Sequence, residues 1–162
     1  MSASTQQFIQ RVKNPFYLKL FFLKSLPLGL LTGLRLISLD ENQSEVAVSY
    51  KYLNKNPFQS LYFAVLAMAG ELSSGILSLL HTHKTSPSVS MLVFHMEADF
   101  TKKAVGKITF RSADGVAIRD AVAKTLATGE GVTVVATSTG TDEQGDTVAV
   151  FRITWTFKAR KK

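Results

Sequence analysis

Apolar and polar residues alternate most strictly near the C-terminal end of the chain. From Thr147 to Arg160, one face of the expected strand is apolar and the other is polar. A polar segment, residues 142–146, separates this strand from a second β-like run at residues 131–141. The pattern predicts a half-buried antiparallel hairpin. Its apolar face consists of Ala149, Phe151, Ile153, Trp155 and Phe157.

A similar alternation lies between Val89 and Phe100. The even-numbered positions from residue 92 onward are apolar, and the odd-numbered positions include His95, Glu97 and Asp99. We therefore expect a half-buried strand whose even-numbered side chains all face the core.

Shorter apolar runs predict three further strands. Residues 33–53 contain two of them, separated by a polar turn at residues 40–43, with the second strand at residues 46–52. The third strand is expected at residues 105–112. A surface helix at residues 116–127 follows it.

The longest regular element is a helix predicted from Pro57 to about Thr82. Asn56 is a preferred N-cap residue, and proline suits the first position of a helix. Residues 61–70 contain no charged residue and almost no polar one. Because a helix without a polar face is surrounded by protein, we expect a sheet to enclose this helix.

The first 32 residues predict a helical extension. Helix-like sequence runs from Ser4 to about Lys24 and is split near Asn14, because the proline that follows restricts this residue. Residues 16–23 are apolar nearly all round. We expect this part to dock on the body of the domain, and the alternative is a helix that lies on a membrane surface.

Together these elements predict an α+β fold in a single domain, residues 1–162. A long buried helix among antiparallel strands is satisfied by one curved antiparallel sheet of five to six strands that wraps around it. Such a sheet leaves an open edge, which commonly pairs with a second copy of the chain. The expected assembly is a homodimer or a dimer of dimers.

Composition excludes several classes of function. The chain has no cysteine, which excludes disulfides and thiolate metal sites and suits the cytoplasm. The net charge of +7 owes much to a basic tail at residues 158–162, and the other cations are scattered, so we expect no nucleic-acid surface. No secretion signal is readable, and charged residues interrupt the apolar stretch at residues 16–39, so no stable membrane insertion is expected.

Glu71 is the main candidate for chemistry. It is the only carboxylate between Glu45 and Glu97, and it lies in the most apolar helix. A buried carboxylate needs a partner, a raised pKa or a water-filled cleft. Ser74, one turn later, is placed to hydrogen-bond the carboxylate or a water. Glu71 is therefore predicted to be a general base, and the alternative is a structural glutamate that forms an ion pair at the edge of the helix.

The segment from Asn56 to Glu71, NPFQSLYFAVLAMAGE, resembles the corresponding segment of hotdog-fold thioesterases. The order of elements and the closing hairpin are also similar, and the resemblance covers about residues 34–157. The most similar branch lies near the phenylacetyl-CoA thioesterase type. In that type, a His-Gly-Gly turn begins the central helix, and an Asp or Glu nine residues after the His serves as general base or nucleophile.

The resemblance implies a hotdog fold and hydrolysis of an acyl-CoA thioester, with coenzyme A as part of the substrate and no further cofactor. It places Glu71 at the catalytic carboxylate position. The sequence departs from the type at the turn, where it has Tyr62-Phe63-Ala64. Backbone N–H groups around Phe63 and Ala64 are expected to bind the oxyanion. The predicted substrate-binding residues are Asn56, Ser60, Tyr62, Phe63, Ala64 and Ser74.

Two other functions remain open. One is non-catalytic binding of an acyl-CoA or a fatty acid, and the other is an acyl-thioester dehydratase or isomerase, which typically needs a histidine beside a carboxylate. No metal site is expected. His95, Glu97 and Asp99 suit the polar face of a strand as well as they suit a metal. His81 and His83 lack a third ligand nearby in the sequence.

Overall fold

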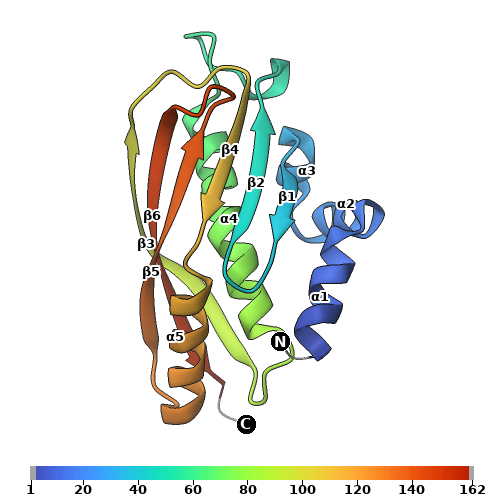
Figure 1. The fold of residues 1–162 in the computed structure, drawn as a ribbon, viewed down its shortest axis with the longest axis vertical. Helices are drawn as coiled ribbons and strands as arrows, with labels where there is room; N and C mark the ends of the chain where they lie inside the picture. Colours follow the sequence, from blue (N-terminus) through green and yellow to red (C-terminus); the bar gives the residue numbers. More distant parts are fainter. Residues whose placement is uncertain (1–2, 161–162) are drawn as a thin grey trace.

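The computed structural model describes residues 3–160, and one curved antiparallel sheet dominates it (Figure 1). The strand order is β1-β2-β4-β5-β6-β3, and every neighbouring pair is antiparallel. The sheet curves around a long helix, α4, as predicted. The strands are β1 (Arg35–Leu39), β2 (Ser44–Ser49), β3 (Val89–Phe100), β4 (Lys107–Ser112), β5 (Val132–Thr141) and β6 (Thr147–Ala159).

Helix α4 (Phe63–Thr82) begins six residues later than the sequence predicted. Asn56 does not cap this helix. Its side-chain oxygen accepts hydrogen bonds from the backbone N–H groups of Phe58 and Ser60, at 3.0 and 3.1 Å, and so stabilises a tight turn. Gln59 lies in the left-handed region of that turn, with φ of 56°. Cap-like residues therefore stabilise a loop here, and the helix starts after it.

Strand β3 also departs from its predicted pattern. The register against β6 shifts between Val93 and His95, so Phe94 forms a β-bulge. Met91 and Val93 pack against the core, whereas Leu92 and Phe94 are 66% and 73% exposed. The prediction that every even-numbered position faces the core is wrong for the first half of the strand, because a bulge exchanges the two faces.

The first strands and the last helix follow the prediction more closely. The hairpin of β1 and β2 turns at residues 40–43, and Asp40 accepts hydrogen bonds from two backbone N–H groups of the turn. The second strand ends at Ser49, and a 3-10 helix, η1 (Tyr52–Asn54), replaces the end expected for it. Helix α5 (Gly115–Thr128) confirms the predicted surface helix.

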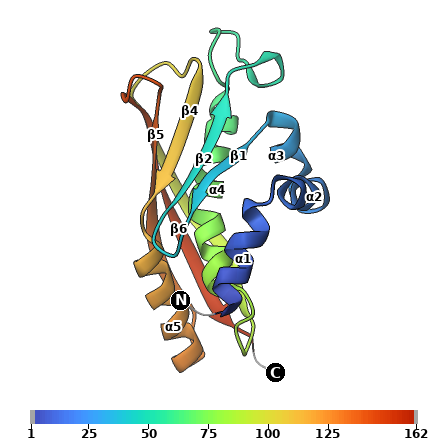
Figure 2. The same ribbon diagram turned by 45° about the vertical axis from the view of Figure 1, so that its right-hand side comes forward.

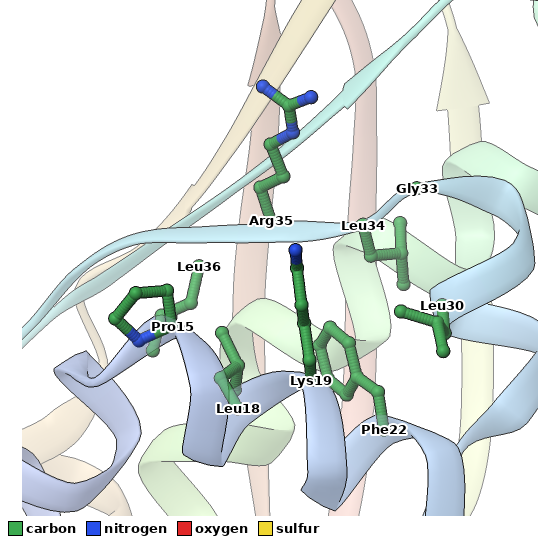
Figure 3. Close-up of a pocket in the computed structure, with 9 residues that line it drawn as sticks. All are labelled: Pro15, Leu18, Lys19, Phe22, Leu30, Gly33, Leu34, Arg35 and Leu36. Atoms are coloured by element: carbon green, nitrogen blue, oxygen red, sulfur yellow. The ribbon is translucent and has the colours of Figure 1, made fainter.

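The N-terminal extension forms three helices: α1 (Ala3–Lys13), α2 (Pro15–Ser25) and α3 (Pro27–Thr32). Asn14 divides the first two, as predicted, and its side chain accepts hydrogen bonds from the N–H groups of Phe16 and Tyr17. Figure 2 shows these helices beside α4 and β1, away from α5. In Figure 3, side chains of α2, including Leu18 and Phe22, point toward β1.

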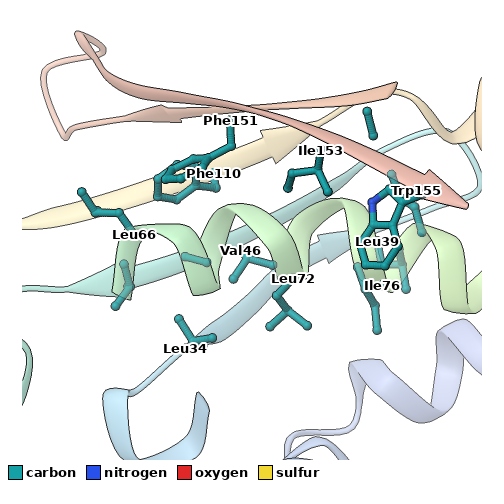
Figure 4. Close-up of a cluster of buried hydrophobic side chains, with 14 of the residues drawn as sticks. Leu34, Leu39, Val46, Leu66, Leu72, Ile76, Phe110, Phe151, Ile153 and Trp155 are labelled. Carbon is teal, nitrogen blue, oxygen red and sulfur yellow. The ribbon is translucent and has the colours of Figure 1, made fainter. Parts of the chain in front are cut away.

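The core lies between α4 and the concave face of the sheet (Figure 4). Phe110 and Phe151 pack there with ring centroids 5.7 Å apart. A Cβ atom on Gly70 of α4 would lie 2.8 Å from the ring of Phe151, so only glycine allows this close contact. In the part of the chain that is described, α4 is the one helix long and apolar enough to cross a membrane. It is buried over 67% of its most apolar stretch, so it is a core helix, and no membrane insertion is indicated.

Candidate functional site

Glu71 lies in the third turn of α4, half-buried from water. Burial raises the pKa of its carboxyl group above the ordinary value of 4.5. Within residues 3–160, no hydrogen bond or ion pair is made by this carboxyl group. A carboxylate that is partly desolvated and has no donor to satisfy it is a stronger base than one in water. The ion pair considered from the sequence as an alternative is absent from the described chain.

The space beside the carboxyl group is provided by Gly75, one turn further along α4. A Cβ atom on Gly75 would lie 3.2 Å from Oε1 of Glu71 and 3.3 Å from Cζ2 of Trp155. The carboxyl group and the indole edge therefore flank the same glycine. Trp155 comes from the centre of β6 and is 3% exposed. It contributes apolar surface that keeps water away from Glu71.

Ser74 forms a hydrogen bond with the indole of Trp155. Its hydroxyl accepts a hydrogen bond from Nε1 of Trp155 at 3.0 Å and donates one to the backbone oxygen of Glu71 at 3.2 Å. The single O–H donor of Ser74 is therefore directed to the helix backbone and not to the Glu71 carboxylate, and the alternative, a hydrogen bond to a water, stays a prediction. Ser74 is fully buried and positions Trp155. Sequence reasoning missed both Trp155 and Gly75 as neighbours of Glu71, since nothing in their local pattern distinguishes them from other core residues.

A cleft of about 560 Å³ lies at the N-terminal end of α4. Four of the six predicted substrate-binding residues line it: Asn56, Ser60, Tyr62 and Phe63. Ala64 and Ser74 do not. Among the lining residues that sequence reasoning missed are Phe100, Lys102 and Lys103, which lie at and just after the end of β3. The rings of Phe63 and Phe100 pack edge to face across the cleft, with centroids 6.4 Å apart.

The cleft favours an anionic ligand at one side. Tyr62 supplies no side-chain cap to α4, so no described residue accepts a hydrogen bond from the backbone N–H groups of Phe63 and Ala64, and these groups can bind a ligand. The ammonium of Lys102 is already held by Asp142 and Asp146, at 2.5 and 2.7 Å. Lys103 has no ion pair within the described residues and leaves its charge available at the rim of the cleft.

Glu71 and the start of α4 are too far apart to act on one atom. Eight residues separate Phe63 from Glu71, which corresponds to about 12 Å along a helix. A thioester carbonyl bound by the N–H groups of Phe63 and Ala64 is therefore out of reach of the Glu71 carboxylate of the same chain. The structure does not bring the two predicted parts of the catalytic site together within one subunit.

Four of the five residues considered as metal ligands have other partners: Glu97, Asp99, His81 and His83. Arg152 of β6 forms ion pairs with Glu97 at 3.4 Å and with Asp99 at 2.7 Å. Both carboxylates lie on β3, the strand that also carries His95. His81 contacts the backbone oxygen of Glu41 through Nε2 at 2.9 Å, and His83 packs against the ring of Phe8. No cluster of three metal-binding side chains occurs among residues 3–160.

The likeness to known proteins is structural. The sequence matches no protein-family model and no curated protein. A Pseudomonas aeruginosa protein of unknown function, named a probable thioesterase, superposes with a TM-score of 0.76 at 24% identity, over 90% of this chain and 97% of that one. The Escherichia coli PaaI protein of the phenylacetic acid degradation operon superposes with a TM-score of 0.65 at 13% identity, over 98% and 97%.

A thioesterase from Haemophilus influenzae superposes with a TM-score of 0.60 at 16% identity, over 86% of this chain and 88% of that one. At identities this low, the structural likeness establishes the fold alone. The chain therefore has the hotdog fold that its sequence resemblance implied, and the proteins that share this fold include several named as thioesterases.

Proposed function

We propose that this hotdog protein hydrolyses an acyl-CoA thioester, with Glu71 as the general base. The observation that carries the proposal is the half-buried Glu71 carboxyl group, which lies on the central helix beside Gly75 and Trp155 and has no hydrogen-bonding partner in the described part of the chain. A buried carboxyl group that has only a structural role is rarely left without a hydrogen-bonding partner. The names of the structural neighbours support thioester hydrolysis as the reaction.

In the proposed reaction, Glu71 takes a proton from water as the water oxygen attacks the thioester carbonyl carbon. The resulting oxyanion is stabilised by the backbone N–H groups of Phe63 and Ala64. The tetrahedral intermediate then breaks its carbon–sulfur bond. The coenzyme A thiolate leaves and takes up the proton held by Glu71. The products are a carboxylic acid and free coenzyme A.

The distance between these groups requires a second subunit. Because about 12 Å of helix separates Phe63 from Glu71 in one chain, the base and the N–H donors that meet at one carbonyl must come from different copies. One of the two edge strands of the sheet, β3, supports such an assembly: it exposes Leu92 and Phe94, and its outer backbone groups have no neighbouring strand among the described residues. We therefore propose at least a homodimer, with a dimer of dimers as its larger form.

Coenzyme A is proposed to enter at the cleft. Its phosphates suit Lys103 and the positive end of the α4 dipole, and the acyl or pantetheine part suits the aromatic lining formed by Tyr62, Phe63 and Phe100. Asn56 is proposed to shape the loop that borders the cleft, through its hydrogen bonds to Ser60.

The test is thiol release from a panel of acyl-CoAs. The absence of cysteine means that a thiol reagent detects only released coenzyme A. Glu71→Gln is expected to lower kcat by about 10²–10⁴-fold, because the amide accepts no proton from water. Glu130→Gln, an exposed carboxylate after α5, is the matched control and is expected to keep full activity. Equal activity of Glu71→Gln and wild type would overturn the proposal.

The second candidate is a non-catalytic acyl-CoA binder. It is favoured by the exposed aromatic residues Tyr62 and Phe63 at the turn where the thioesterase type has His-Gly-Gly. Acyl-CoA binding by the wild type without any thiol release identifies this function. A dehydratase or isomerase is disfavoured, because His81, the nearest histidine in α4, lies about 15 Å along the helix from Glu71.

A further inference from the structure

Helices α2 and α3 carry an apolar surface that no other part of the described chain covers. Its residues are between 53% and 77% exposed, with Phe16 the most exposed. Leu23, Leu28 and Leu31 also line one open hollow between the two helices. We call this surface the α2–α3 face. It consists of Phe16, Leu20, Leu23, Leu28 and Leu31.

The spacing of these residues separates the surface from the packing side of the same helix. Phe16, Leu20 and Leu23 follow one another at intervals of four and three residues and so form one stripe. Leu18 and Phe22 lie on the other side and pack against the core. The helix therefore docks on the domain with one side, as expected from the sequence, and still presents a second apolar side to solvent.

Lysines border the stripe on both sides. Lys19 lies one turn before Leu23, and Lys24 lies one turn after Leu20, so each ammonium is about 40° around the helix from the edge of the stripe. Such long cationic side chains extend away from an apolar surface while their stems cover it. An apolar stripe bordered by lysines is the arrangement of helices that lie in the interface of a lipid bilayer.

Two basic residues, one on α2 and one on β1, lie beside this face. Lys19 and Arg35 are among the residues that line an apolar cleft of about 430 Å³ between α2 and β1. In Figure 3 the Lys19 side chain points from α2 toward β1, and the Arg35 side chain points away from α2. Neither makes an ion pair within the described residues. Each of these unpaired cations suits the phosphate group of a lipid. At the far end of the face, Lys51 donates to the backbone oxygen of Leu31 at 2.9 Å.

The positive charge of the N-terminal segment determines which partner fits the α2–α3 face. The first 39 residues contain five basic residues and no acidic one: Arg11, Lys13, Lys19, Lys24 and Arg35. Two copies of the α2–α3 face brought together would repel each other through these cations. An anionic lipid surface attracts them and receives the apolar stripe at the same time.

We propose that the α2–α3 face docks the protein on the surface of an anionic phospholipid bilayer. Phe16, Leu20 and Leu23 enter the boundary between headgroups and acyl chains. The side chains of Lys19, Lys24 and Arg35 contact lipid phosphates. The docking is peripheral, and α4 stays in the core.

The experiment is co-sedimentation with vesicles of phosphatidylcholine, either pure or with about one third phosphatidylglycerol. The wild type is expected to bind the anionic vesicles and not to bind the neutral ones. Phe16→Ser/Leu20→Ser/Leu23→Ser should weaken this binding by at least about tenfold. Val116→Ser/Val135→Ser removes two exposed valines of α5 and β5 and is the matched control, expected to bind like the wild type.

The charge contribution is measured separately. Lys19→Gln/Lys24→Gln should weaken binding to anionic vesicles, and Lys124→Gln/Lys158→Gln, which removes the same charge from exposed positions elsewhere, should weaken it less. Raising the salt concentration to about 0.5 M should release the wild type, because salt screens the lipid phosphates. Phe16→Trp should show blue-shifted emission when anionic vesicles are added, whereas the buried Trp155 gives a constant background.

Three results would overturn the proposal. The first is a wild type that stays in solution with anionic vesicles. The second is equal vesicle binding by the triple serine variant and its valine control. The third is a change in molar mass by light scattering on the triple serine substitution, with unchanged vesicle binding, which would assign the face to a second copy of the chain. Circular dichroism of each variant establishes that it is folded.

Discussion

Glu71 is a carboxyl group that is partly removed from water and that receives no hydrogen bond from residues 3–160. Desolvation by burial raises its pKa, so the folded state favours the protonated form more than the unfolded state does. A group of this kind adds stability below its unfolded pKa, near 4.5. That contribution is lost as the pH rises through the folded pKa. At neutral pH, Glu71 is therefore a cost to folding.

We expect Glu71→Gln to be more stable than the wild type at pH 7, because the neutral amide avoids the cost of burying a charge. The difference should shrink as the pH falls toward 4 and vanish below it, because the wild-type side chain is then neutral as well. Urea unfolding of both proteins across this pH range measures it. A variant that is less stable than the wild type at pH 7 would contradict the desolvated state of Glu71.

Glu71 was recognisable in the sequence because a single carboxylate interrupts a long apolar helix. Its neighbours were not recognisable. Trp155 is one of five alternating apolar residues in β6, and Gly75 is one of several small residues in α4. Only the register between helix and sheet places them beside the carboxyl group, and a local pattern contains no information about that register.

Helix α4 depends on close packing with β6 at Gly70. A methyl group there would lie 2.8 Å from the buried ring of Phe151, which is itself held by Phe100 and Phe110. We expect Gly70→Ala to destabilise the protein, because overpacking costs about 1–3 kcal/mol. Alanine recovers at most about 1 kcal/mol of helix propensity.

Thermal unfolding measures the effect. Gly131→Ala is the control, because nothing lies within 4 Å of a Cβ atom at that position. It should leave the melting temperature nearly unchanged. A Gly70→Ala variant as stable as this control would show that α4 can shift relative to β6.

The elements differ in how well alternation predicts them. The prediction of the β5–β6 hairpin was correct because β6 keeps one register against β5 from Ala149 to Phe157, and the irregularity at Val148 lies only at the turn end. The predicted orientation of the side chains was wrong for the first half of β3, because the bulge at Phe94 cannot be recognised from the residue types. The start of α4 was misplaced because Asn56 and Pro57 suit a helix start and a tight turn equally well. Tertiary contacts choose between the two.

The assembly should depend on the exposed edge of the sheet. We expect Leu92→Lys/Phe94→Lys to be monomeric, because the cations oppose one another when two β3 edges approach. Val135→Lys, at an exposed position of the interior strand β5, should leave the assembly intact. Light scattering at micromolar concentration measures both.

The monomeric variant should also lose thioesterase activity, since the base and the N–H donors then no longer meet at one carbonyl. A monomeric wild type, or a monomeric variant with full activity, would refute the two-subunit site.

The sequence predicted the curved sheet around a buried helix, because a helix without a polar face allows few other arrangements. The separation of Glu71 from the helix start became measurable only when the true start of α4 was known.

The strand order also determines when the protein can finish folding during synthesis. Strand β3 pairs only with β6, and residues 101–146 lie between them in the chain. At about 5–20 residues per second, the ribosome needs several seconds to make that interval. Until β6 emerges, α4 lacks part of its cover and the exposed apolar side chains of β3 lie on an unpaired strand. A nascent chain in this interval is the form of the protein most in need of a chaperone.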